Sequence, residues 1–203
     1  MSHIIITRCK FGDDQKFLNY FEMMKKYYIP SINNQTNKNF KIALIANERH
    51  YELIRKEIDN KIEILRFGDQ KGDYRDYITK IPLTLQTRHD CDDYMSNTYV
   101  SKIQKLYESN KDKYETFILN FQPIKFIDST QNEYTHSRDY SKVCSMFSTL
   151  IQKNTKYGIF DVMHDQLSRI SKNIIYIKDP YVKLIIHGNN ALSKLNENDR
   201  PIK

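Results

Sequence analysis

The sequence predicts one α/β domain, residues 1–203, with a central, mainly parallel mixed β-sheet flanked by helices. Short β-branched apolar runs alternate with segments of helical period, which is the order that right-handed crossovers between parallel strands require. A chain of 203 residues is long enough for one domain with a sizeable core. An apolar share of 39% and a charged share of 28% are typical of globular proteins.

The first third of the chain alternates between strands and helices. Residues 3–8 form a β-branched apolar run, which predicts a buried strand. Apolar residues recur every three or four positions in residues 15–28, so we expect a helix there that Pro30 ends. The next expected elements are a strand at residues 42–46, a helix at 51–58 and a strand at 62–65.

The apolar stretch 81–85 predicts a fourth strand, and an acidic segment follows it directly. Ser96 is a helix-capping residue type, and an apolar stripe predicts a helix that extends to residue 107. Residues 122–141 are polar and aromatic without a period, which predicts an irregular excursion near a site. The remaining expected elements are a strand at 117–119, a helix at 143–151, strands at 174–177 and 182–186, and a polar tail at 191–203.

The net charge of +7 suits nucleic acid, an anionic membrane or a phosphorylated small ligand. The lysines are scattered among Asn and Glu, and the sequence contains no run of four basic residues and no aromatic RNA-binding signature. An acidic cluster also repels phosphate unless a metal intervenes. We therefore expect no nucleic-acid partner.

The three cysteines, Cys9, Cys91 and Cys144, lack the paired spacing of a zinc site, which favours a reducing compartment. No charged leader and no apolar window of membrane-spanning length is present, so we expect a cytoplasmic protein without a membrane span. Fifteen tyrosines could supply a core wall or the surface of a homodimer, and the sequence leaves both open.

The acidic segment places Asp90, Asp92 and Asp93 at the expected C-terminal end of the fourth strand. Carboxylates at that end of a strand can hold a hard divalent cation against a diphosphate. In an extended segment Asp90 and Asp92 face one side, and Asp93 faces the other unless the chain turns. The alternative is a solvated turn that caps the following helix.

Several segments together resemble the rhamnosyltransferase group of GT-A glycosyltransferases. They are residues 7–8, residues 28–40 with their Gln35-Thr36 step, the T-R-x-D-x-D-D segment at 87–93, and the histidine motifs at 163–167 and 186–190. The resemblance implies a GT-A type, Rossmann-like domain with a nucleotide-sugar half at residues 1–116 and an acceptor half at 117–190. It also implies a nucleotide-diphosphate sugar donor, a glycan or other hydroxyl acceptor, and Mn²⁺ or Mg²⁺ as cofactor.

The function expected from this resemblance is metal-dependent transfer of a hexosyl or deoxyhexosyl group, such as rhamnosyl, to an acceptor hydroxyl. The metal neutralises the leaving diphosphate as a Lewis acid. Inversion is expected because no nucleophile is identifiable. A catalytically silent sugar-nucleotide or glycan-binding module is the alternative. A metal-dependent phosphotransferase or nuclease is a third class, and the chain lacks the Gly-rich loop of its P-loop version.

We expect Asp92 and Asp93 to bind the metal, with His187 at the end of a late strand as a further ligand. Asp90 is the candidate for a contact to the donor ribose or the metal. Asn189 belongs to the turn that follows His187, where the alternative role for the histidine is to satisfy the backbone of that turn.

Thr7, Arg8 and Arg88 lie at expected strand ends and are candidates for binding the donor, with surface ion pairing as the alternative for both arginines. His164 is a further candidate that could also be an ordinary half-buried histidine. An inverting transfer needs a base, and Asp161 and Asp165 are the candidates, beside Asp139 in the irregular segment. Their alternative roles are a helix cap for Asp161 and solvated charges for the others.

Overall fold

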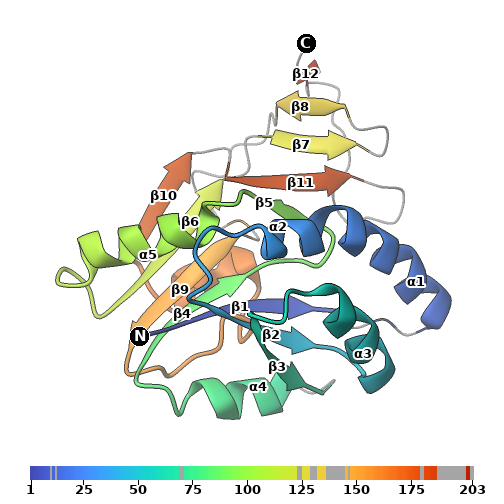
Figure 1. The fold of residues 1–203 in the computed structure, drawn as a ribbon. Helices are drawn as coiled ribbons and strands as arrows, with labels where there is room; N and C mark the ends of the chain where they lie inside the picture. The colour runs from blue at the N-terminus through green and yellow to red at the C-terminus, as the bar shows by residue number, and fades with distance from the viewer. Residues whose placement is uncertain are drawn as a thin grey trace.

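The computed structural model of the chain contains two β-sheets, the larger below the smaller in Figure 1. It describes residues 1–9, 11, 13–68, 71–122, 125–128, 132–135, 145, 147–178, 181–186 and 200–201. His187 and Asn189 lie outside these residues, as does Asp139. In the described part of the chain, no helix has the length and apolarity that a membrane span needs.

The larger sheet has seven strands in the order β10-β6-β9-β4-β1-β2-β3. All neighbouring strands are parallel except that β9 is antiparallel to both β4 and β6. This arrangement confirms the predicted α/β fold with a central, mainly parallel mixed sheet. The strands are β1 (Ser2–Arg8), β2 (Lys41–Ile45), β3 (Glu63–Phe67), β4 (Leu83–Arg88), β6 (Thr116–Gln122), β9 (Ser148–Lys153) and β10 (Ile174–Lys178).

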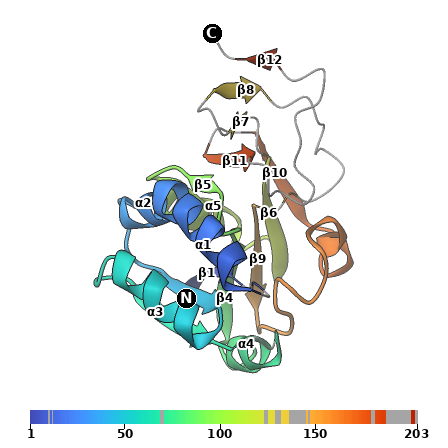
Figure 2. The ribbon, with the colours of Figure 1, turned by 90° about the vertical axis from the view of Figure 1, so that its right-hand side faces the viewer.

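Helices cover both faces of this sheet. One face packs against α1 (Asp14–Met23), the π-helix η1 (Met24–Tyr28), α2 (Ile29–Asn33), α3 (Glu48–Glu57) and α5 (Tyr99–Asn110). The other face packs against α4 (Lys71–Ile78) and the 3₁₀-helix η2 (His164–Arg169). Figure 2 shows the first group on one side of the strands and η2, in orange, on the other. The two faces of the central strands bury two separate apolar clusters.

The smaller sheet has the order β12-β8-β7-β11-β5. Its strand β5 directly follows the acidic segment in the sequence. Its strands are β5 (Tyr94–Met95), β7 (Lys125–Asp128), β8 (Glu133–Thr135), β11 (Val182–Ile186) and β12 (Arg200–Pro201). β11 lies between β7 and β5, so the late apolar run predicted as a strand pairs with the residues that follow the acidic segment.

Five of the described tyrosines are buried in the core, one of the two roles that the composition left open. Tyr28, Tyr74 and Tyr99 are among the largest fully buried side chains. The hydroxyls of Tyr28 and Thr7 lie 2.6 Å apart, and the Tyr74 hydroxyl donates to Gln86 at 2.8 Å. A buried phenol needs such a partner, because an unsatisfied hydroxyl in an apolar interior is costly.

The Gln35-Thr36 step joins the end of α2 to the start of α5. Gln35 is 2% exposed, and its amide donates to the carbonyls of Ser31 and Ser96 while its side-chain oxygen accepts from the backbone of Val100. The backbone N–H of Thr36 donates to the carbonyl of Asn97 at 2.8 Å. These bonds give this step a structural role.

Three predictions about elements are wrong. The helix does not end before Pro30, because proline occupies the first turn of α2, where a missing N–H is tolerated. Residues 148–153 form strand β9 and not a helix, since a short apolar run fits a buried strand equally well. Within residues 122–141, predicted to be irregular, the described part contains β7 and β8.

Candidate functional site

The acidic segment lies at a topological switch point of the larger sheet. The chain proceeds from β1 outward through β2 and β3, and then returns to the other side of β1 as β4. In open α/β sheets, ligands bind in the crevice outside the carboxyl ends of the strands at such a point. Arg8 ends β1, and Arg88 ends β4 two residues before Asp90, so the two arginines and the acidic segment share this edge.

Arg88 and Asp90 form a partly buried ion pair, with 3.5 Å between Arg88 Nε and Asp90 Oδ1. The guanidinium also lies 4.9 Å from the centre of the Phe160 ring. Burial raises the pKa of Asp90 above its usual range, Arg88 opposes this shift, and the charge of Asp92 adds to it. Within the described residues Arg88 Nε is buried and makes no hydrogen bond, which leaves a donor beside the carboxylates.

Asp93 points into the protein and is 3% exposed. Its Oδ1 accepts a hydrogen bond of 3.0 Å from the backbone N–H of Ile185 in β11. Burial raises the pKa of Asp93 well above its usual range, and the charges of Asp92 and Asp90 raise it further. The Asp93 carboxyl thus links β11 of the smaller sheet to the acidic segment. Asp93 was predicted to bind a metal, and this hydrogen bond already occupies one of its two oxygens.

A metal would find two half-buried carboxylates here, those of Asp90 and Asp92. In the parts of the chain that the structure describes, no group of three or more His, Cys, Asp or Glu side chains could hold a metal ion. Mg²⁺ is commonly bound by one or two carboxylates together with substrate phosphates and water, and carboxylates also suit Mn²⁺. Asp90 and Asp92 therefore fit a divalent cation whose remaining ligands come from a diphosphate.

Tyr20 and His164 approach the acidic segment from helices on opposite faces of the sheet. Burial raises the pKa of the Tyr20 hydroxyl, and the charges of Asp92, Cys91 and Asp90 add to the shift. The charge of His164 slightly lowers the pKa of Asp90. His164 was a candidate from the sequence, whereas Tyr20 in α1 was missed, because nothing local distinguishes it from the other aromatic residues of that helix.

His89 fixes the backbone of the acidic segment from the core side. Its Nδ1 lies 2.8 Å from the carbonyl oxygen of Asp90, and its ring makes edge contacts with Tyr28 and Phe147. Burial lowers the pKa of His89 to about 4, so the ring is neutral at physiological pH and Nδ1–H is the donor. The D-x-D pattern concerns only the carboxylates and therefore does not predict this role of His89.

Thr7 and Arg8 differ in their surroundings. The Thr7 side chain is fully buried and bonded to Tyr28, so its hydroxyl belongs to the core. Arg8 is exposed at the carboxyl end of β1. Of the two, the exposed arginine is available to a ligand at the edge of the sheet.

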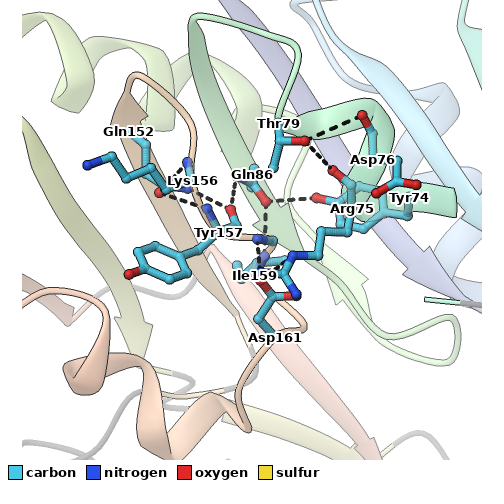
Figure 3. A network of polar contacts seen from close by, with 11 residues as sticks. Tyr74, Arg75, Asp76, Thr79, Gln86, Gln152, Lys156, Tyr157, Ile159 and Asp161 are labelled. Carbon is cyan, nitrogen blue, oxygen red and sulfur yellow. Dashed lines mark hydrogen bonds and ion pairs between the residues drawn. The ribbon is translucent and has the colours of Figure 1, made fainter. Parts of the chain in front are cut away.

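The two candidate bases also differ. Asp161 Oδ2 accepts from the backbone N–H of Gly158 at 3.0 Å and lies 3.5 Å from Arg75 Nε of α4. Figure 3 labels Asp161 and Arg75. These contacts hold a turn. Asp165 is exposed in the first turn of η2, directly after His164.

The Gln86 side chain, in β4, binds the backbone of residues 157–159, directly before Phe160 (Figure 3). Its side-chain oxygen accepts from the Tyr74 hydroxyl at 2.8 Å and from the backbone N–H of Ile159 at 2.9 Å. Its amide donates to the carbonyl of Tyr157 at 2.9 Å. This buried network places Phe160 against Arg88, two residues beyond Gln86 in β4.

The fold of this chain is similar to that of other solved structures. One solved structure with this fold is the 1–349 fragment of S. aureus TarS in complex with UDP-GlcNAc. It superposes with a TM-score of 0.58 at 11% identity, covering 96% of this chain and 62% of the fragment. This chain thus spans about three fifths of the fragment's length.

A second solved structure belongs to a protein described as a nucleotide-diphospho-sugar transferase, from Desulfovibrio desulfuricans G20. Its TM-score is 0.50 at 8% identity, covering 91% of this chain and 82% of that one. No protein-family profile and no curated protein matches the sequence. At these identities the likenesses establish the fold.

Proposed function

We propose that this protein is a metal-dependent glycosyltransferase that moves a hexosyl or deoxyhexosyl group from a nucleotide-diphosphate sugar to an acceptor hydroxyl. The observation that carries the proposal is the grouping of Asp90, Asp92 and Arg88 at the switch point of the sheet. The UDP-GlcNAc complex of TarS, a protein with the same fold, supports a nucleotide-sugar donor. A rhamnosyl group is one member of the proposed donor class.

In this proposal Asp92 holds Mn²⁺ or Mg²⁺ with Asp90, and His187 is the candidate for a third ligand. The bound cation would neutralise charge on the departing diphosphate. Arg88 contributes a fixed positive charge and a buried Nε–H donor without an acceptor among the described residues, which suits a phosphate oxygen. Arg8 would add a second guanidinium from the neighbouring strand.

We assign the role of catalytic base to Asp165 in preference to Asp161. Asp161 already accepts from Gly158 and lies beside Arg75, so its carboxylate is engaged in contacts that hold a turn. Asp165 is exposed and adjacent to His164, whose charge acts on Asp90. A base in this position would take the proton of the acceptor hydroxyl in an inverting transfer.

The second candidate function is a sugar-nucleotide or glycan-binding module without turnover. It is favoured by the occupation of Asp93 and Asp161 in structural contacts, which leaves few carboxylates for catalysis. The transferase and a sugar-nucleotide-binding module both require donor binding, and only the transferase also requires chemistry at the anomeric carbon.

The test is thermal unfolding of the purified chain with UDP, GDP, dTDP or CDP, each with Mn²⁺ or EDTA. Ligand at 100 times its Kd stabilises the native state by about 2.7 kcal/mol, which corresponds to ~5–10 °C in Tm for a chain of this size. We expect such a shift with one nucleotide and Mn²⁺, and its loss in Asp92→Asn. The matched control is Asp112→Asn, which changes an exposed carboxylate after α5.

Absence of a shift with all four nucleotides would refute donor binding, and with it the transferase and the sugar-nucleotide-binding module. If a shift is found, hydrolysis of the corresponding nucleotide sugar separates them. Slow Mn²⁺-dependent release of free sugar, abolished in Asp92→Asn, supports the transferase, and intact donor after prolonged incubation supports the module.

A further inference from the structure

A groove of about 560 Å³ lies between the η1–α2 helix and the face of the smaller sheet. Helix residues including Lys26, Tyr27 and Asn34 form one wall, and β5 and β11 form the other with Tyr94 and Lys183. The volume lies within the range of ~300–1,000 Å³ typical of small-molecule sites. Arg88, Asp90 and Asp92 do not line this groove, so it is distinct from the candidate donor site.

The groove combines cations, aromatic rings and amides, and its lining contains no Asp or Glu among the residues that the structure describes. The Lys26 ammonium lies 5.2 Å from the centre of the Tyr27 ring, and the Lys183 ammonium lies 5.5 Å from that of Tyr94. Lys183 also pairs with Glu133, whereas the structure gives the exposed Lys26 no carboxylate partner among the described residues. The local charge is therefore positive and favours an anionic ligand.

The uncharged lining indicates the rest of the ligand. Asn34 and Asn97 are exposed and offer amide donors and acceptors. Such groups match sugar hydroxyls, while the partly exposed ring of Tyr94 can contact the C–H face of a pyranose. Aromatic rings, amides and ammonium groups together fit a sugar chain that carries negative charges.

We infer that this groove binds an anionic oligosaccharide, and that this sugar chain is the part of the acceptor remote from the hydroxyl that receives the sugar. The second half of the inference rests on the proposed function. Tyr94 follows Asp92 by two residues, which an extended chain spans in about 7 Å. An acceptor in the groove would thus have its end close to the candidate donor site.

An acidic peptide is the competing ligand for a basic groove, and the backbone argues against it. A peptide added to the β5 edge would need free carbonyl and N–H groups there. The carbonyl of Asn97 already accepts from the N–H of Thr36, and the carbonyl of Ser96 accepts from the Gln35 amide at 2.6 Å. The chain directly after β5 therefore has these acceptors occupied.

The test is calorimetric titration with three probes: hyaluronan tetrasaccharide, neutral chitotetraose and triglutamate. We expect the hyaluronan fragment to bind at least 10-fold more tightly than the others, with affinity that falls as salt rises. Lys26→Gln and Tyr94→Leu should each weaken binding at least 5-fold. Lys56→Gln, an exposed lysine on α3, is the control and should bind as the wild type does.

Equal binding of triglutamate, no binding of the hyaluronan fragment, or full affinity in Lys26→Gln would each overturn the inference. Donor binding is measured separately on the same proteins by the nucleotide-dependent Tm shift. A normal nucleotide-dependent Tm shift without oligosaccharide binding rejects the inference about the groove and leaves the proposed function in place. Oligosaccharide binding without any nucleotide shift rejects the proposed transferase and leaves a glycan-binding groove.

Discussion

Arg88 and Asp90 form an ion pair across a single residue at the end of β4, with 3.5 Å between Nε and Oδ1. Both side chains are partly buried, and the Phe160 ring lies beside the guanidinium. Burial favours the protonated carboxyl at Asp90 and the arginine favours the carboxylate, so Arg88 extends to lower pH the range in which Asp90 is ionised, as the proposed cation site requires.

Replacing this arginine should therefore change a pH profile. Arg88→Met keeps the aliphatic stem and removes the charge, so the pKa of Asp90 should rise further. We expect the midpoint of Mn²⁺-dependent nucleotide stabilisation to move to higher pH, measured as ΔTm between pH 5 and 8. Arg49→Met, which removes an exposed arginine from α3, is the control. An unchanged midpoint in Arg88→Met would show that Asp90 does not titrate with cation binding.

Asp93 should affect stability in a pH-dependent way. Its pKa is raised in the folded protein, so the folded state holds this proton to higher pH than the unfolded chain does. The contribution of Asp93 to stability is thus full below about pH 3.9 and is lost as the pH rises through the folded pKa. Asp93→Asn keeps an oxygen for Ile185 N–H and should be more stable than the wild type at pH 7.

The comparison variant at this position is Asp93→Ala. It leaves the Ile185 N–H without its acceptor and should destabilise by about 1–3 kcal/mol. Urea unfolding at pH 4 and pH 7 measures both effects. If Asp93→Asn instead abolishes the Mn²⁺-dependent nucleotide shift while remaining folded, Asp93 is a metal ligand as the sequence suggested.

Gln86→Leu should be strongly destabilising. The change removes the partner of the Tyr74 hydroxyl and of the Ile159 N–H in a buried network (Figure 3). Each unsatisfied buried group costs about 1–3 kcal/mol, so we expect a loss of at least ~2 kcal/mol in urea unfolding. Tyr74→Phe removes one of these bonds and should cost less. A loss below that of Tyr74→Phe would contradict the role given to Gln86.

Substitutions of Asp161 and Asp165 should have different effects: the first should lower stability, and the second should lower the rate of transfer. Asp161→Ala breaks the turn bond to Gly158 and should lower stability by about 1 kcal/mol, while donor binding stays near the wild-type level. Asp165→Asn should leave stability unchanged, because the side chain is exposed. It should reduce transfer at least 100-fold if Asp165 is the base, the lower end of the usual range of ~10²–10⁴.

Local patterns predicted most of the larger sheet. The runs 3–8, 42–46, 62–65 and 81–85 correspond to β1, β2, β3 and β4, because β-branched apolar runs of this length are characteristic of buried strands. The helix at 143–151 was a wrong prediction because an apolar run between two strands looks the same in either conformation. α4 was missed, and it carries few apolar residues.

The candidate site could be predicted only where it is continuous in sequence. The D-x-D segment and its place after the fourth strand are local features, so Arg88, Asp90 and Asp92 were singled out. Tyr20 and Phe160 reach the same region from α1 and from the chain after β9, through packing that no spacing records. The structural roles of Asp93 and Asp161 likewise depend on residues that are distant in sequence. Asp93 binds Ile185 in β11, and Asp161 pairs with Arg75 in α4.

The hydrogen bond from Ile185 to Asp93 joins residues 92 positions apart. During synthesis the carboxylates therefore emerge long before β11, the strand that completes their surroundings. Until that strand docks, Asp93 is a charged, solvated side chain. The acidic segment then follows β4 of the larger sheet without its hydrogen bond to β11. Folding contacts this distant in sequence form late because closing a long loop costs entropy. A chain that ends before residue 185 should thus form the larger sheet's first strands yet hold its acidic segment in an unfinished, inactive arrangement.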